Sequence, residues 1–452
     1  MSAPKYLAII NKIELMIRSG EYPEGGKLPT HRELAHQLGT TPITVAKAYK
    51  ELAEKKLIES FVGRGSFVCN HSQLSDVIKA ESREQESNLS ILQPCLSSDI
   101  VERLNQVFSQ VLVRGNDDLF GYAEHTGLLH HREMGACWAR KFGLDVASGE
   151  QMVLVNGAQH ALSALIECYT QPGDCIAVEA LTYPGILSLV NLLGRKAVAI
   201  PIDQHGMIPQ ELDSICRETP IAMVIIVPSH QNPTAATMSV ERRQQLADVI
   251  HQHQIWLAED DIYGFLNPSV IPAITNFVPE YGFHITSLSK AISPGLRCGY
   301  IKTPDTEYER LAAFIRTTIW LPSPIVFAAA SLLIASGEAF DMAKEQRNMA
   351  IRRQILAREI LGHFEIHAQP DSYHLWLMLP EFWNTDAFTL AAKNKGILVS
   401  SASYFCADPR APVPHAIRLS LMAIKSEPEL MVALNKLADL LRKNARFDYT
   451  HC

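Results

Sequence analysis

Between residues 150 and 290, short apolar segments alternate with segments of helical periodicity, and this alternation constrains the fold more than any other feature of the sequence. The apolar segments are rich in β-branched residues, whereas segments such as Ala158–Cys168 and Val240–His253 repeat their apolar residues at the helical spacing. Strands that alternate with helices in this way build an α/β layer with a mostly parallel sheet. The expected strands are Gln151–Asn156, Cys175–Glu179, Lys196–Ile200, Ile221–Val227, Ile255–Glu259 and His284–Leu288.

Polar residues follow these expected strands at the points where the strands end. In an open α/β sheet, ligands bind beyond the carboxyl ends of the strands, so we expect these residues to share one site. Gly157 and Ala158 also open a helix whose free N–H groups can hold an anion. The candidate side chains are Tyr183, Asn232, Asp260, Tyr263, Ser289, Lys290 and Arg297, with Arg418 late in the chain.

This combination of side chains predicts a site for pyridoxal 5′-phosphate (PLP). A lysine can form a Schiff base with the aldehyde of PLP, and a carboxylate can keep the pyridine nitrogen protonated, which makes the ring an electron sink. Phenol and amide groups can bond the ring hydroxyl, while serine, arginine and a helix N-terminus can hold the phosphate. Each residue alone is a weak signal, and the prediction depends on their order along the chain.

The order and spacing of these residues resemble the fold-type I, aspartate aminotransferase-like family over about residues 100–445. The resemblance implies that Lys290 is the Schiff-base lysine and that Asp260 pairs with the pyridine nitrogen. It also implies that Asn232 and Tyr263 bond the ring oxygen and that Tyr183 stacks on the ring face. We therefore expect an α/β, PLP-dependent aminotransferase-like domain in this part of the chain.

The same resemblance assigns the phosphate and the substrate carboxylate. Arg418 corresponds to the arginine that binds the substrate α-carboxylate, and Tyr122 to the tyrosine that reaches the phosphate of the neighbouring subunit. Ser289 could bond either the phosphate or the backbone. Ala235 stands where the family usually has glycine, which leaves the local turn geometry open. The phosphate would be held by Ala158 and Gln159, mainly through their backbone N–H groups, and by Ser287 and Arg297.

Residues 1–70 have the pattern of a helix-turn-helix followed by a hairpin. The run Thr30-His31-Arg32-Glu33 reads as a capping box at the start of a short helix that ends at Gly39. Thr41-Pro42 then opens a second helix, with proline at its first position. The two strands of the hairpin are expected at Leu57–Val62 and Ser66–Cys69, joined by Gly63-Arg64-Gly65.

These motifs resemble the GntR-type winged helix over about residues 4–69. The matching runs are Leu28-Pro29-Thr30-His31-Arg32-Glu33-Leu34-Ala35, Thr44-Val45-Ala46-Lys47-Ala48-Tyr49 and Gly63-Arg64-Gly65-Ser66-Phe67-Val68. In such domains the second helix of the motif lies in the major groove of DNA. The family often has arginine where this chain has Pro42, so the base readout there must differ. The resemblance implies DNA contacts by Arg32, Thr41, Thr44 and Lys47, and a minor-groove contact by Arg64 in the wing.

The charge distribution fits this division of the chain. Residues 1–70 hold 10 Lys/Arg and 7 Asp/Glu, a net charge of +3, whereas the whole chain has a net charge of −7. Residues 71–93 contain no glycine, proline or aromatic residue and are rich in charged and serine residues, which is typical of a linker. We therefore expect a DNA-binding domain at 1–70, a linker at 71–97, and an aminotransferase-like domain at 98–452, whose large and small subdomains meet near residue 325.

The combination of a GntR-type winged helix with an aminotransferase-like domain resembles the MocR/GabR subgroup of transcriptional regulators. It implies a PLP-dependent regulator, a head-to-tail homodimer, that binds operator DNA and senses an amino compound or PLP through an aldimine at Lys290. Arg418 would anchor an effector that carries a carboxylate. The alternative is a working aminotransferase with an appended DNA-binding domain, because the groups needed for transamination are present.

Two further features bear on the compartment. The nine cysteines are irregularly spaced and form no C-x-x-C pair, which argues against a disulfide framework and against a metal site. The uncharged stretch Thr317–Gly337 is long enough to span a membrane, but its two prolines favour a buried loop and the start of a helix. We expect a cytoplasmic protein without a signal peptide.

Overall fold

The computed structural model describes residues 5–18, 21–22, 26–54, 57–61, 65–68, 86–113, 115, 117–121 and 127–442. The chain forms two compact units, one made chiefly of residues 1–76 and one that contains nearly all of residues 77–452. Each unit has its own hydrophobic core.

The first unit is the expected winged helix-turn-helix. The side chain of Thr30 accepts a hydrogen bond from Glu33 N, and the Glu33 carboxylate accepts one from Thr30 N, which completes the predicted capping box. Gly39 takes the left-handed backbone (φ 60°) that the turn between the two helices requires. The elements are α1 (Lys5–Arg18), α2 (His31–Gln37), α3 (Pro42–Glu54) and the antiparallel hairpin β1 (Ile58–Phe61) and β2 (Gly65–Val68).

The second unit is built on a seven-stranded, mostly parallel sheet with the strand order β4-β12-β11-β10-β9-β5-β6. All six predicted strands are present, within two residues of the expected bounds. The sequence reading missed β12, a short strand antiparallel to both of its neighbours. The strands are β4 (Met152–Val155), β5 (Cys175–Glu179), β6 (Lys196–Ile200), β9 (Ile221–Ile226), β10 (Trp256–Asp260), β11 (Gly282–Ser287) and β12 (Gly299–Lys302).

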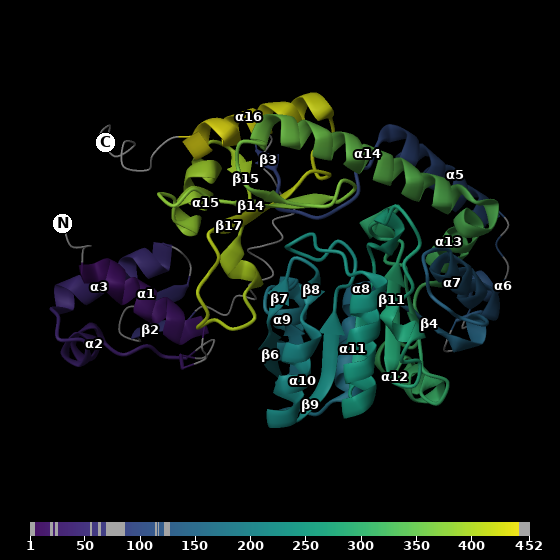
Figure 1. The fold of residues 1–452 in the computed structure, drawn as a ribbon, viewed down its shortest axis with the longest axis horizontal. Helices are drawn as coiled ribbons and strands as arrows, with labels where there is room; N and C mark the ends of the chain where they lie inside the picture. Colours follow the sequence, from purple (N-terminus) through teal and green to yellow (C-terminus); the bar gives the residue numbers. More distant parts are fainter. Residues whose placement is uncertain are drawn as a thin grey trace. The chain divides into compact units, whose positions relative to one another are not determined.

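Helices cover both faces of this sheet (Figure 1). On one face, α8 (Ala158–Tyr169), α9 (Pro184–Leu192) and α12 (Tyr308–Ile319) share a core with the strands. On the other face, α10 (Pro209–Glu218) and α11 (Val240–His253) pack against one half of the sheet. The other half is covered by α5 (Ser98–Val113), α6 (Asp117–Phe120), α7 (Leu129–Lys141) and α13 (Pro324–Ser336), and a small hairpin, β7 (Ile202–Asp203) and β8 (Gly206–Met207), follows β6.

The small subdomain has an antiparallel sheet with the order β13-β14-β17-β16. The 24-residue helix α14 contributes to the core of the large subdomain through Met342 and to the core of the small one through Leu361. The remaining elements are α14 (Glu338–Leu361), β13 (Ile366–His367), β14 (His374–Met378), α15 (Thr385–Asn394), β15 (Ile397–Leu398), β16 (Ser400–Ser401), β17 (Ala416–Ser420) and α16 (Glu427–Arg442).

The expected subdomain boundary near residue 325 is too early. Helix α13 lies after that boundary, yet Phe327, Leu333 and Ile334 are buried in the core of the large subdomain. The change from one core to the other takes place within α14. The uncharged stretch around residues 317–337 is therefore the end of α12, a loop and a buried helix, as expected.

The expected linker is also too long. Residues 86–97 are folded: β3 (Ser87–Asn88) pairs in parallel with β15, and Leu89 is fully buried in the core of the small subdomain. Residues 86–93 continue a run without glycine, proline or aromatic residues, so their composition resembled that of a linker. Residues 69–85 lie outside the described residues.

In the described part of the chain, no single helix is long and apolar enough to cross a membrane. Only α13 and α14 together meet the length and composition criteria, and they meet at a bend of 81°.

Two adjacent arginines of α14 provide a test of this packing. The buried Arg353 donates hydrogen bonds to the carbonyls of Leu421 and Ile424 at 2.6 and 2.7 Å, whereas the exposed Arg352 pairs with Glu427 at 3.0 Å. We expect Arg353→Met to lower the free energy of unfolding by about 3 kcal/mol or more, because buried carbonyls lose their donors. Arg352→Met should cost less than about 1 kcal/mol, as exposed ion pairs do. Denaturant unfolding of both variants measures the difference, and equal losses would contradict this account.

Candidate functional site

The predicted Schiff-base lysine follows β11 at the carboxyl edge of the sheet. Lys290 Nζ donates a hydrogen bond of 2.6 Å to the carbonyl of Leu92. Burial and the positive charge of Arg418 lower the pKa of Lys290 to about 8, although the charge of Asp260 opposes them. A larger fraction of this amine than of an ordinary lysine is therefore neutral near physiological pH, and the neutral amine is the form that attacks a carbonyl carbon.

Asp260 ends β10 and lies close enough to Lys290 for its charge to act on the lysine. Its side chain is buried, and Oδ1 has no hydrogen-bond partner among the described residues. Burial and the neighbouring charge of Asp261 raise the pKa of Asp260 to about 7. An unpaired buried carboxylate oxygen is a suitable acceptor for a pyridinium N–H, so this residue fits the ring nitrogen of PLP.

The N-terminus of α8 forms an anion cradle beside this carboxylate. Gly157 is its N-cap, with φ 79° and no side-chain cap, and a Cβ at Gly157 would lie only 2.7 Å from Arg297 Nη2. Arg297 donates to the Asn156 carbonyl at 3.1 Å, which holds its guanidinium beside the free N–H groups of α8. Glycine is needed here for both its backbone angle and its lack of a side chain.

Two predicted phosphate ligands, Ser287 and Ser289, contact each other. Ser287 Oγ is 2.9 Å from both Ser289 Oγ and the Cys298 carbonyl, and it accepts a hydrogen bond from Ser289 N. The side-chain amide of Gln159 donates to the Gly185 carbonyl at 3.1 Å.

Arg418 lies on β17 of the small subdomain, where the sequence placed the carboxylate-binding arginine. Nη1 donates to Asn232 Oδ1 at 2.8 Å, and Nη2 donates to Ser400 Oγ at 3.0 Å and to the Ser90 carbonyl. Burial lowers the pKa of Arg418 to about 10. Because Asn232 accepts through its oxygen, its amide nitrogen remains available as a donor.

Two tyrosines complete the group that the sequence predicted. Tyr183 is the N-cap of α9, and burial together with the charge of Asp260 raises its pKa to about 12. The charges of Arg418 and Asp260 both act on Tyr263, which is 3% exposed, and burial raises its pKa. Tyr122 lies outside the described residues.

The sequence analysis missed one part of the site entirely, which we call the 86–92 segment. Ser87 N and Leu89 N donate to the carbonyls of Gly396 and Leu398, both at 2.8 Å, and this pairing carries the segment past the small-subdomain sheet. The next residues supply the carbonyls of Ser90 and Leu92 that Arg418 and Lys290 hold. A backbone carbonyl leaves no signature in a sequence, so composition alone could not identify these acceptors.

Further missed residues connect the site to the small subdomain. Tyr373 Oη donates to the carbonyl of Lys290 at 2.8 Å, and the buried His230 contacts Ser372 Oγ through Nδ1 at 2.7 Å. Burial lowers the pKa of His230 to about 3, so this histidine is neutral. Ala235 keeps the left-handed backbone of the glycine that the family usually has, with φ 60°. It bears the strain of that conformation, about 1 kcal/mol.

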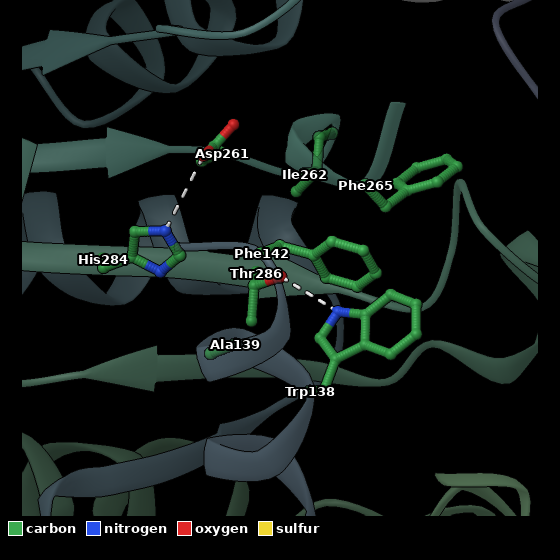
Figure 2. Close-up of a pocket in the computed structure, with 8 residues that line it drawn as sticks. All are labelled: Trp138, Ala139, Phe142, Asp261, Ile262, Phe265, His284 and Thr286. Atoms are coloured by element: carbon green, nitrogen blue, oxygen red, sulfur yellow. Dashed lines mark hydrogen bonds and ion pairs between the residues drawn. The ribbon is translucent and has the colours of Figure 1, made fainter. Parts of the chain in front are cut away.

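A second buried cluster contains Asp261, the residue that follows Asp260 in the sequence (Figure 2). Asp261 and His284 face each other across 4.0 Å at a small cavity, and the indole of Trp138 donates to Thr286 at 3.2 Å. Glu259, Asp261 and His284 are spaced closely enough to hold a metal ion. However, Arg243 Nη1 lies 3.8 Å from both carboxylates and already supplies a positive charge. The cavity is lined by Trp138, Ala139, Phe142, Asp261, Ile262, Phe265, His284 and Thr286.

The predicted DNA contacts lie on the winged-helix unit. Arg32, Thr41 and Lys47 are exposed, and Thr44 is half-buried. The hydroxyls of Thr41 and Thr44 pair at 2.8 Å, and the Lys47 ammonium lies 4.1 Å from the ring centre of Tyr6. Arg64 lies outside the described residues.

Comparisons with known proteins agree with both halves of the chain. Residues 88–437 match the aminotransferase class I and II family, and residues 5–68 match the bacterial regulatory proteins of the gntR family. The chain is 29% identical to the HTH-type transcriptional regulator YdeF of Bacillus subtilis, over 97% of this chain and 94% of that protein. It is 23% identical to the HTH-type pyridoxine biosynthesis transcriptional regulator PdxR of Corynebacterium glutamicum, over 88% of each.

Among solved structures, an archaeal alanine:glyoxylate aminotransferase superposes with a TM-score of 0.74 at 22% identity, covering 82% of this chain and 96% of that one. This likeness establishes the fold-type I architecture of the second unit. Proteins of this family depend on PLP, so PLP is the cofactor of this fold.

The lowered pKa of Lys290 gives a prediction for cofactor uptake. The rate at which the cofactor-free protein takes up PLP should rise with pH and level off above about pH 8, because only the neutral amine reacts. Visible absorbance in stopped flow measures this rate. Lys290→Ala should abolish the lysine-bound absorbance, whereas Lys302→Met, at a second buried lysine, should retain it. A rate that still rises towards the ordinary lysine value of 10.5 would contradict the prediction.

Proposed function

The chain belongs to the aminotransferase class I and II family and carries a gntR-family DNA-binding domain, and we propose on this premise that it is a PLP-dependent transcription regulator of the MocR/GabR subgroup that senses an amino compound. One observation carries this proposal. Two basic residues of the site, Lys290 and Arg418, hold the 86–92 segment, which follows the stretch that joins the aminotransferase-like unit to the DNA-binding unit. Hydrogen bonds therefore connect the site to the residues that directly follow that stretch.

The residues of the site fit PLP, and each would hold one part of it. Asp260 would accept the hydrogen bond of the protonated ring nitrogen through its unpaired Oδ1. The N-terminus of α8, with Arg297, Ser287 and Ser289, would hold the phosphate. When bound, PLP supplies a carbonyl carbon for which Lys290 and the amine of an effector compete.

Arg418 selects for the other end of the effector. A carboxylate makes a stronger, charge-assisted pair with a guanidinium than the backbone carbonyl of Ser90 does. An amino acid effector would therefore draw Arg418 away from Ser90. Lys290, released by the effector amine, would be free to donate to Leu92, as it does at 2.6 Å in this structure.

Effector binding would thus replace one hydrogen bond to the 86–92 segment by another. The bond from Arg418 to the Ser90 carbonyl would break, and the bond from Lys290 to the Leu92 carbonyl would form. A ligand shifts a conformational equilibrium only if it binds the two states with different affinity. This exchange of hydrogen-bond donors provides the difference, because the effector satisfies Arg418 in only one of the two arrangements. The winged helices would then change their affinity for operator DNA, which would place the working protein in the cytoplasm with the chromosome.

A test of this function uses a leucine that anchors the segment. Leu89 and Leu437 are both fully buried in the core of the small subdomain, but only Leu89 belongs to the 86–92 segment. Each change to alanine should cost about 2–5 kcal/mol of stability. Leu89→Ala should also bring the ratio of DNA affinities with and without the effector close to one, whereas Leu437→Ala should keep it. Fluorescence anisotropy on a promoter fragment measures the ratio.

The effector is first found by screening amino acids for a change in the visible spectrum, and Leu89→Ala should retain that change. The proposal fails if the effector alters the spectrum but not the DNA affinity of the unmodified protein. If the protein then releases an oxo acid over many turnovers, the alternative function as an aminotransferase is the correct one.

We also propose that the working protein is a homodimer. Three apolar side chains at the ends of α5 and α6 are more exposed than a monomer usually tolerates in one stretch: Leu112 at 54%, Val113 at 87% and Phe120 at 68%. They precede Tyr122, which by family resemblance reaches the neighbouring subunit. A second copy of the chain would cover these residues and complete each cofactor site.

The dimer prediction can be checked by light scattering after size exclusion. Val113→Glu should shift the protein from dimer towards monomer, because it places a charge in an apolar interface. Leu192→Glu, at an isolated leucine of α9 that is 79% exposed, should leave the mass unchanged. A wild-type protein that elutes as a monomer at micromolar concentration would contradict the proposal.

A further inference from the structure

The recognition helix α3 has one face in the core and the opposite face in solvent. Val45, Ala48, Tyr49 and Leu52 are at most 2% exposed and pack in the core of the winged helix. The outward face carries Ile43, Ala46, Lys47 and Lys50, which follow one another at helical spacing. This face therefore begins with a large apolar residue and continues with a small residue and two cations.

Ile43 is conspicuous because nothing in the described part of the unit covers it. Its side chain is 83% exposed, and it does not belong to the core of the winged helix. Leaving a large apolar side chain in water gains nothing for the stability of the unit. On the face that a winged helix presents to DNA, such a residue is instead available for contact with a base.

The other residues of the first turn offer little for reading base edges. Pro42 has no N–H and no polar side chain, and the hydroxyls of Thr41 and Thr44 bond each other at 2.8 Å. Residues 41–44 contain no arginine, lysine, asparagine or glutamine, the side chains that make bidentate contacts with guanine or adenine. The one apolar group that the major groove displays is the C5-methyl of thymine.

We propose that Ile43 reads the C5-methyl group of a thymine in each operator half-site. The proposal rests on the proposed DNA-binding function and specifies how that function selects its sequence. Lys47 and Lys50, on the same face, would approach the phosphates that flank the groove, while the small Ala46 allows the helix to come close to the base edges. This chain has Pro42 where the family often has arginine. Recognition would thus shift from a guanine edge to the methyl group of a thymine.

The test removes the methyl group without changing base pairing. The full-length protein with PLP first selects its binding site from random duplex DNA, and each thymine of a selected half-site is then replaced by deoxyuridine. At one of these thymines, the replacement should weaken DNA binding by the wild type about fourfold, which is the effect of losing one buried methyl group. Binding by Ile43→Ala should not respond to the same change.

Two further variants separate this contact from general effects. Leu15→Ala, at an apolar residue of α1 that is 43% exposed, should respond to deoxyuridine as the wild type does. Lys47→Ala should weaken binding to all sequences to a similar extent, because a phosphate contact carries no sequence information. The exposure of Ile43 means that its change to alanine leaves the fold intact, which thermal unfolding checks.

The outcomes are distinct. Loss of the deoxyuridine effect in Ile43→Ala alone supports the proposal. Equal sensitivity of the wild type and Ile43→Ala to deoxyuridine at every thymine overturns it, while DNA binding itself stands. If the full-length protein selects no sequence, both this proposal and the DNA-binding function are wrong.

Discussion

Burial of the central sheet on both faces determines where chemistry is possible in the large unit. The strands β4, β9 and β11 are almost entirely buried, because helices cover both sides. A charged side chain placed along these strands would lose its hydration without a partner. Charged groups can therefore be placed only at strand ends, which is why Asp260 and Lys290 both follow strands at one edge.

At that edge, two groups of buried charges behave differently. In the inner group Glu259 accepts three hydrogen bonds from Ile274 and Thr275, and Arg243 Nη1 lies 3.8 Å from both carboxylates, although Asp261 Oδ1 has no hydrogen-bond partner among the described residues. The outer group is left open, because Asp260 Oδ1 has no partner among the described residues. An unpaired buried polar atom costs stability. Because Arg243 already supplies a positive charge to the inner group, Asp260 is the carboxylate that a cationic ligand group can stabilise.

The sequence predicted those parts of the molecule that depend on side-chain pattern. The strands Cys175–Glu179 and Lys196–Ile200 were predicted to the residue, because each is a short run with β-branched residues that follows a charged residue, Asp174 or Arg195. That the side chains following the strands form one cofactor site stays a prediction, although the charges of Asp260 and Arg418 both act on Lys290. By contrast, β12 is short and follows an irregular loop, so it gave no periodic signal. The 86–92 segment was misread because backbone pairing with β15, far along the chain, holds it in place.

The backbone contacts of the 86–92 segment have a consequence for how such a protein can be regulated. An enzyme of this fold needs its lysine and arginine only for cofactor and substrate, and both residues are side chains that a sequence reveals. In this chain the same two side chains also hold the backbone carbonyls of Leu92 and Ser90. Coupling between the cofactor site and the 86–92 segment through backbone carbonyls needs no additional side chain. Any sequence that keeps the strand pairing of Ser87 and Leu89 therefore retains this coupling. A regulator of this kind can therefore keep the side chains of an aminotransferase unchanged. It differs from the enzyme in the DNA-binding domain that precedes residue 86.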